Sequence, residues 1–199
     1  MELDHVLIAA TDLEEAAREF ERHGLSSVEG GRHRDWGTAN RIVPLGSCYI
    51  ELIAVVDEAV AADSAFGRWV AGGASPEGRP LGWAVRTSGV DDVAGRLDLV
   101  VRSGSRVTPS GEELRWRSAG VDEAIAEPCL PFFIEWDEGV PLPGTQNPRR
   151  ATISRLVLEG NPDRLAAWLG EHSLPIRVLN GPAEVAAVVL STSAGEIIL

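Results

Sequence analysis

The sequence predicts an α+β fold made of repeated βαβββ modules. An apolar strand from Leu3 to Ala10 is followed by a helix that begins at Thr11-Asp12 and then by several short strands. The same order of strand, helix and short strands returns from Leu81 and again from Ile153, which indicates an internal repeat. The strands after each helix come in runs joined by short turns, so antiparallel pairing is favoured over a parallel α/β sheet.

The elements of the first module, residues 1–56, follow from their spacing. Leu13, Ala16, Ala17 and Phe20 recur at helical intervals, and Gly24 ends that helix. A polar loop is expected from Gly30 to Asn40, and strands are expected at Ile42–Leu45 and Tyr49–Ile53.

Breaks in the pattern give the other boundaries. The expected divisions are a connector helix and loop at 57–80, a second module at 81–136, a linker at 137–150 and a third, shorter module at 151–199. The third module has no partner within the chain. It is expected to cover its exposed sheet against the second module or in a homodimer.

Composition limits the classes of partner. The net charge of -12 argues against nucleic acid and anionic membranes, since both need clustered basic residues. No apolar stretch of about 18 residues is present, and the two cysteines form no disulfide scaffold. These features predict a cytoplasmic protein with a small-molecule ligand.

The carboxylate of Glu51 lies in an unusual sequence environment for a charged group. Glu51 lies in the middle of an apolar strand whose two faces both look buried. A carboxylate is costly there unless it is paired, hydrogen-bonded or bound to a metal. The pattern predicts that Glu51 lines a small-molecule cleft, where a raised pKa would suit it to general acid–base catalysis.

Other residues are candidates for substrate binding. His33, Trp36 and Asn40 offer a stacking face and hydrogen-bonding groups, so their loop either recognises substrate or is simply a structural loop. Arg86 lies in an apolar run and needs a carboxylate, either from Glu51 or Glu135 or from an acidic substrate.

Several segments together resemble a known family. The strand with His5, the helix start at Asp12-Leu13 and the strand with Glu51 resemble the first module of the vicinal oxygen chelate superfamily, which includes glyoxalase I, bleomycin-resistance proteins and extradiol dioxygenases. The run GGRHRDWGTANRIVPLG, followed by YIELIAV, GWAVRT and PFFIEW, resembles more narrowly the glyoxalase-like domain branch, over roughly residues 3–136. The resemblance implies that two modules pair around a cleft.

The resemblance also implies a ligand set for one divalent metal, Zn, Mn or Fe. Its members are His5 and Glu51 from the first module and Glu135 from the second, and Glu51 and Glu135 are then the catalytic carboxylates. The fourth position falls on Gly82, which has no side chain. Without a metal, His5 is a core histidine or a neighbour of Glu51 in acid–base chemistry.

Two functions of different classes follow from the resemblance. One is lyase or isomerase chemistry, with or without a metal, on a small carbonyl- or oxygen-bearing metabolite. The alternative is a non-catalytic protein that binds or sequesters a small molecule or drug, as bleomycin-resistance proteins do.

Overall fold

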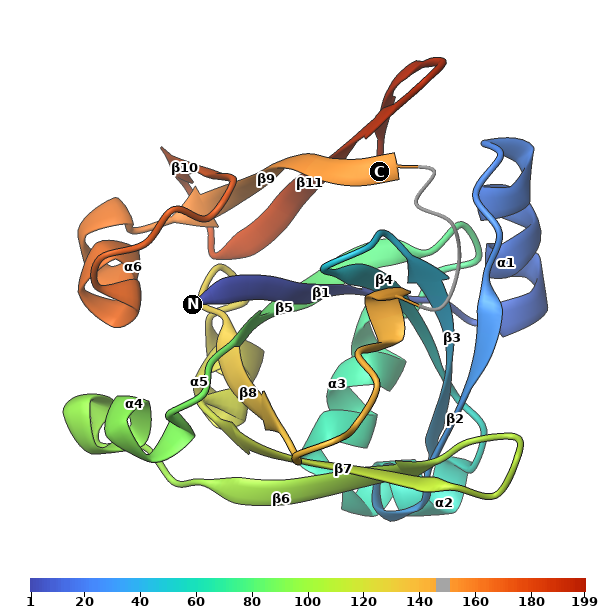
Figure 1. Ribbon diagram of the computed structural model, residues 1–199, viewed down its shortest axis with the longest axis horizontal. Helices are drawn as coiled ribbons and strands as arrows, with labels where there is room; N and C mark the ends of the chain where they lie inside the picture. Colours follow the sequence, from blue (N-terminus) through green and yellow to red (C-terminus); the bar gives the residue numbers. More distant parts are fainter. Residues whose placement is uncertain (146–150) are drawn as a thin grey trace.

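A computed structural model describes residues 1–145 and 151–199 of the chain, and it shows a closed barrel beside a smaller sheet (Figure 1). The barrel has the strand order β1-β4-β3-β2-β6-β7-β8-β5, and the smaller sheet has the order β10-β9-β11-β12. The predicted α+β class with βαβββ modules is confirmed.

The element bounds follow the three repeats. The first repeat holds β1 (Glu2–Ala9), α1 (Leu13–Arg22), β2 (Val28–His33), β3 (Thr38–Pro44) and β4 (Tyr49–Val55). Helices α2 (Glu58–Asp63) and α3 (Ala65–Gly73) precede the second repeat, which holds β5 (Arg79–Arg86), α4 (Val90–Leu97), β6 (Arg102–Val107), β7 (Glu113–Ala119), α5 (Val121–Ala126) and β8 (Phe132–Trp136). The third holds β9 (Ala151–Gly160), α6 (Pro162–Leu169), β10 (Ile176–Asn180), β11 (Glu184–Thr192) and β12 (Gly195–Ile198).

The first two modules pair in the same way within themselves. In each, the last strand runs parallel to the first, and the strands between them are antiparallel. The modules join along β1 and β5, and they join again where Arg32 of β2 pairs with Val107 of β6. This second junction closes the expected cleft into a barrel. Gly31 permits the junction, because a Cβ there would overlap the carbonyl of Val107.

The expected polar loop from Gly30 to Asn40 is instead mostly strand. Strand β2 runs to His33, a 3-10 turn covers Arg34–Trp36, and β3 begins at Thr38. The inward-facing positions of these strands are polar, so the apolar alternation that marks a strand in a sequence is missing.

Two smaller differences concern helices. The single connector helix expected within residues 57–80 is two helices, because the Ser64 hydroxyl accepts a hydrogen bond of 3.1 Å from Gly67 N and starts the second one. Helix α5 was not predicted. Helix α3 packs Phe66 and Val70 into the apolar cluster that Leu7 and Ile53 share inside the barrel.

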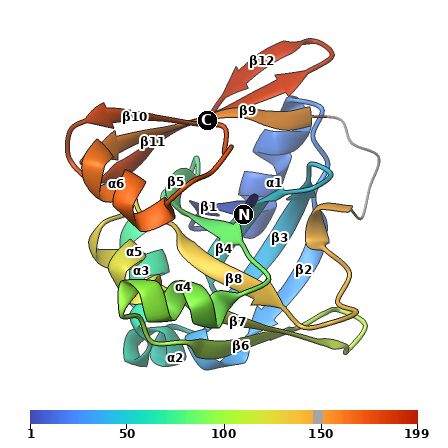
Figure 2. The same ribbon diagram turned by 60° about the vertical axis from the view of Figure 1, so that its left-hand side comes forward.

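The third repeat has the predicted element order but a different sheet. Its first strand, β9, lies between β10 and β11, whereas β1 lies beside the last strand of its own module. The sheet packs on the outer face of the barrel, as Figure 2 shows, where Leu156 and Val188 share one core with Trp83 and Phe133. The Trp168 indole of α6 donates a hydrogen bond of 2.9 Å to Pro131 O.

The packing against the barrel covers one face of the third sheet within a single chain. A homodimer is not needed for this purpose and remains a prediction. Among the helices of the described residues, none is long and apolar enough to cross a membrane.

Candidate functional site: an acid–base cluster inside the barrel

Glu51 projects from β4 into the barrel and is surrounded by hydrogen-bonding groups. Its side chain is 8% exposed. The Asn40 amide donates a bond of 2.6 Å to Oε1, and His33 Nε2 lies 3.8 Å from the same oxygen. The other oxygen, Oε2, lies 3.3 Å from His5 Nε2. Each imidazole therefore points its Nε2 atom toward the Glu51 carboxyl group.

The His5 ring is held from behind by Asp4. Asp4 is fully buried, and its Oδ1 lies 2.8 Å from His5 Nδ1. Its Oδ2 accepts bonds from Trp136 Nε1 at 3.1 Å and from Arg86 Nη1 at 3.2 Å. Burial tends to raise the pKa of Asp4, but the hydrogen bonds and positive charge of these partners outweigh it and leave the pKa lowered. Asp4 is therefore ionised and can only accept, so His5 Nδ1 carries a hydrogen.

This arrangement favours a proton on either His5 Nε2 or Glu51, which lie within ion-pair distance of each other. If Nε2 and the carboxylate were both unprotonated, two lone pairs would face each other at 3.3 Å in a buried site. The contact is favourable when one proton lies on either partner. Asp4, His5 and Glu51 thus lie in a row, with contacts of 2.8 Å and 3.3 Å between neighbours.

The second imidazole, His33, is neutral. Its Nδ1 lies 3.0 Å from the Thr38 hydroxyl. Burial, helped by the charge of Arg106, lowers its pKa to about 4, although the Glu51 carboxylate acts in the opposite direction. A neutral ring can donate or accept a hydrogen bond beside Glu51 without adding charge.

A guanidinium from the second module completes the cluster. Arg106 of β6 is 3% exposed, and its Nη1 donates a bond of 3.2 Å to Asn40 Oδ1. The Asn40 amide therefore links Glu51 on one side with Arg106 on the other. Among the described residues, Arg106 Nε is buried without a hydrogen-bond partner.

Aromatic rings form the walls around these groups. His5 stacks on Tyr49 with ring centroids 4.8 Å apart, and Phe132 meets the imidazole edge-on at 5.5 Å. His33 lies 5.1 Å from Trp36 and 6.0 Å from Trp116. Burial raises the pKa of Tyr49 well above 10, so its phenol stays protonated. These walls fix both imidazoles and lower the local dielectric constant.

Most of the residues that the sequence singled out lie in this cluster, but two do not. His5, His33, Trp36, Asn40 and Glu51 come together in the barrel. Glu135 faces outward, where its Oε2 accepts a bond of 3.2 Å from Val90 N and lies 3.8 Å from Arg117 Nη1. The Arg86 guanidinium donates hydrogen bonds to Glu2, Asp4 and Ser47 O. Of these partners, Asp4 is the one that belongs to the cluster.

The placement of Glu135 corrects the expected alignment of the closing strands by one residue, and that of the leading strands by two. Parallel pairing joins His5 to Tyr49 in the first module and Ala84 to Phe132 in the second. The structural counterpart of His5 is therefore Ala84, not Gly82. Counting two residues along each closing strand makes Ile134 the counterpart of Glu51. A shift of one residue moves a strand's side chain to the other face of the sheet.

The expected metal ligands are consequently not assembled. The two positions that would complete a four-ligand set with His5 and Glu51 hold Ala84 and Ile134, whose side chains have no donor atoms. In the part of the chain that the structure describes, no group of three or more His, Cys, Asp or Glu side chains could hold a metal ion. The residues present do not fit the divalent metal that the resemblance implied.

Two members of the cluster, Asp4 and Arg106, were missed from the sequence. Asp4 should face away from His5 by strand alternation, but the register of β1 against β5 shifts between Leu3 and His5. Asp4 is the extra residue of this bulge, and bulges redirect side chains. Arg106 is the one buried side chain in β6, yet nothing local in the sequence marks it.

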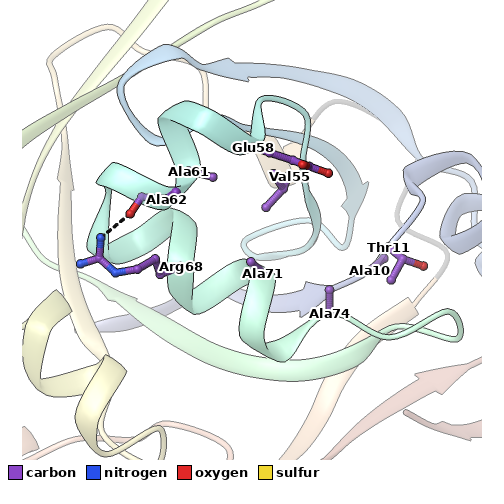
Figure 3. A pocket seen from close by; sticks show the side chains of 9 residues that line it. All are labelled: Ala10, Thr11, Val55, Glu58, Ala61, Ala62, Arg68, Ala71 and Ala74. Carbon is purple, nitrogen blue, oxygen red and sulfur yellow. Dashed lines mark hydrogen bonds between the residues drawn. The ribbon is translucent and has the colours of Figure 1, made fainter.

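A separate pocket, with a volume of about 480 Å³, lies apart from this cluster. Its lining residues come from helices α2 and α3 and from the ends of β1 and β4 (Figure 3). Small apolar side chains such as Ala61 and Ala71 dominate its wall, with Glu58 and Arg68 as its charged members. Arg68 is turned toward the Ala62 carbonyl, to which it donates a bond of 2.7 Å.

Comparison with known proteins agrees with this architecture. Residues 3–173 match the family described as the glyoxalase-like domain. A hypothetical protein from Staphylococcus aureus has a similar structure, with a TM-score of 0.73, 16% identity and coverage of 96% of this chain and 91% of that one. No curated protein matches the chain.

Two structures of named enzymes also match, and only the first of them has a TM-score above 0.5 and bears on the fold. A triple mutant of 4-hydroxymandelate synthase from Streptomyces coelicolor has a TM-score of 0.52 and 10% identity, with 99% of this chain covering 62% of that one. Methylmalonyl-CoA epimerase from Mycobacterium tuberculosis has a TM-score of 0.47 and 22% identity, covering 67% of this chain and 85% of that one.

The paired modules define the chain as a vicinal oxygen chelate protein. Within that superfamily, it belongs to the glyoxalase-like domain family.

Proposed function

We propose that the barrel interior is a proton-transfer site and that the protein is an enzyme with lyase or isomerase chemistry on a small carbonyl-bearing molecule. The observation that carries the proposal is the chain from Asp4 through His5 to Glu51, with contacts of 2.8 Å and 3.3 Å. A carboxyl group that shares a proton with an oriented imidazole is the equipment of general acid–base catalysis.

The chemistry follows from the groups present. The Glu51 carboxylate takes a proton from the carbon next to the carbonyl, and the electron pair of that C–H bond moves toward the carbonyl oxygen. Neutral His33 supplies a hydrogen-bonding group on the same side. Where the α-carbon carries a hydroxyl group, the hydroxyl proton moves to the former carbonyl oxygen and the carbon-bound proton returns to the former carbonyl carbon, which completes an isomerisation. Where the next carbon carries a leaving group, that group departs with the electron pair of its bond, which completes a lyase reaction.

Asp4 is a positioning residue in this scheme. It keeps a hydrogen on His5 Nδ1, so that Nε2 is the nitrogen that faces Glu51. His5 then passes the shared proton to or from Glu51 between turnovers. No step is assigned to a metal, because Ala84 and Ile134 stand where its remaining ligands would be.

Binding without turnover is the second candidate function. The pocket of about 480 Å³ favours it, because its wall is mostly alanine and none of the acid–base cluster lines it. Such a pocket would hold an apolar molecule without acting on it.

Exchange of carbon-bound hydrogen tests the proposed enzyme. Small carbonyl compounds such as pyruvate and hydroxyacetone are incubated in D₂O with the protein, and loss of the α-proton signal is followed by NMR. Exchange faster than in buffer is expected with the unaltered protein and is expected to be lost in Glu51→Gln. Exchange that continues unchanged in Glu51→Gln would contradict the assignment, and Glu58→Gln, in the separate pocket, is the matched control.

A further inference from the structure

We propose that Arg106 is the recognition group for the carboxylate of a small acidic ligand, which enters through a cavity between β2, β6 and β7. The proposal names the substrate class of the proton-transfer site and in that respect rests on the proposed function. The carboxylate site itself is argued from Arg106 and its surroundings alone.

The first argument is the unbalanced charge of Arg106. The side chain is 3% exposed, and a guanidinium remains protonated at all relevant pH values. A buried charge needs a counterion, but the ion pairs found among the described residues do not include Arg106. By contrast, Arg86 is paired with both Glu2 and Asp4. Arg106 is therefore a buried cation whose carboxylate partner is not supplied by the described chain.

The second argument is the number of unused donors. A guanidinium has five N–H donors in a planar fork. In the hydrogen bonds of the described residues, Arg106 uses one, from Nη1 to Asn40 Oδ1 at 3.2 Å, and its buried Nε has no partner. A carboxylate can accept two parallel hydrogen bonds from this planar fork. It therefore fits the guanidinium better than a single water molecule does.

The third argument is a cavity that reaches Arg106. Its volume is about 230 Å³, which suits a molecule of a few heavy atoms, and its lining includes Gly30, Arg106, Thr108 and Leu114. Glu29 and Glu112 also line it, but both side chains are exposed and lie where solvent screens them, whereas Arg106 is buried. The cavity thus has a buried positive group in its wall.

Gly30 leaves room for the contact between Arg106 and Asn40. A Cβ on Gly30 would overlap Asn40 Oδ1 and Arg106 Nη1, so only glycine lets the guanidinium and the amide meet there. The same amide donates to Glu51 Oε1 at 2.6 Å. A carboxylate held by Arg106 is thus separated from Glu51 by a single amide group, which suits a short oxo or hydroxy acid.

Isothermal titration with pyruvate tests the proposal, with uncharged hydroxyacetone and inorganic phosphate as comparison probes. Pyruvate is expected to bind the unaltered protein. Binding should weaken roughly ten- to hundred-fold in Arg106→Met, because charge-assisted hydrogen bonds are lost. Arg106→Lys, which keeps the charge but not the fork, should fall between them. Arg32→Met removes an exposed charge from the neighbouring strand and should bind pyruvate normally.

Urea unfolding of each variant checks that it is folded, and the lysine variant keeps the test valid if methionine is not tolerated. Equal pyruvate affinity in Arg106→Met and the unaltered protein would overturn the proposal. So would binding of phosphate or hydroxyacetone without binding of pyruvate, or no pyruvate binding by the unaltered protein. In that last case, α-proton exchange with hydroxyacetone would still uphold the proposed function, so the two failures are distinguishable.

Discussion

Asn40→Leu is expected to be one of the most destabilising isosteric changes in the barrel. The amide of Asn40 is the partner of two charged groups at once, because Nδ2 donates to Glu51 and Oδ1 accepts from Arg106. Leucine fills a similar volume but leaves both charged groups without this partner. A hydrogen bond to a charged group contributes about 1.5–3 kcal/mol, so the loss of both costs about 3–6 kcal/mol. That is a large part of the stability of an ordinary domain, about 5–15 kcal/mol.

Urea unfolding measures this difference, and Thr38→Val is its matched control. Thr38 lies two residues away on the same strand and is as buried as Asn40, but its hydroxyl meets only neutral His33, at 3.0 Å. A bond between neutral groups contributes about 1 kcal/mol. The unfolding midpoint should fall several times further for Asn40→Leu, with the slope unchanged. Equal losses in the two variants would refute the reading of Asn40 as the link between two buried charges.

Three further outcomes are expected. The free energy of unfolding should fall as the pH is lowered from about 6.5 to about 4. In this range His33 takes up a proton in the unfolded chain, whereas burial lowers its pKa to about 4 in the folded protein and keeps it neutral. At 1.36 kcal/mol per pH unit, the loss amounts to roughly 3 kcal/mol. Denaturation at several pH values should show a flatter dependence in His33→Gln but not in exposed His172→Gln. Asp4→Asn should slow α-proton exchange by roughly 100-fold or more in the NMR assay, because its amide can donate to His5 Nδ1 and so stabilise the wrong tautomer; equal rates would contradict the positioning role. The pair Ala84→His and Ile134→Glu should create zinc affinity in a chelator competition that the unaltered chain lacks, and neither single change should suffice.

The fold class could be predicted from the sequence, because apolar spacing, helix starts and turns indicate the βαβββ order locally. The sequence was also enough to show that Glu51 is buried, because its strand is apolar on both faces. Alternation failed where the chain departs from regular pairing. Asp4 is the extra residue of a bulge, and the repeat was aligned one residue out of register at Glu135, which reversed its face.

The remaining features depend on contacts between distant parts of the chain. Arg106 meets Asn40 across 66 positions, and no local pattern shows which strand of the second module will lie beside β2. The sequence predicts a loop where the strand that ends at His33 lies, because the inward side chains of this strand are polar members of the cluster and not part of the apolar core. A functional interior therefore hides the periodicity by which strands are recognised.

Nitrogen-15 NMR of the histidine rings tests most directly whether His5 and Glu51 share a proton. His5 is expected to carry a hydrogen on Nδ1, toward Asp4, and the signal of its Nε2 is expected to change when Glu51 is replaced by glutamine. A His5 ring with its only hydrogen on Nε2, or an Nε2 signal indifferent to Glu51→Gln, would contradict this expectation.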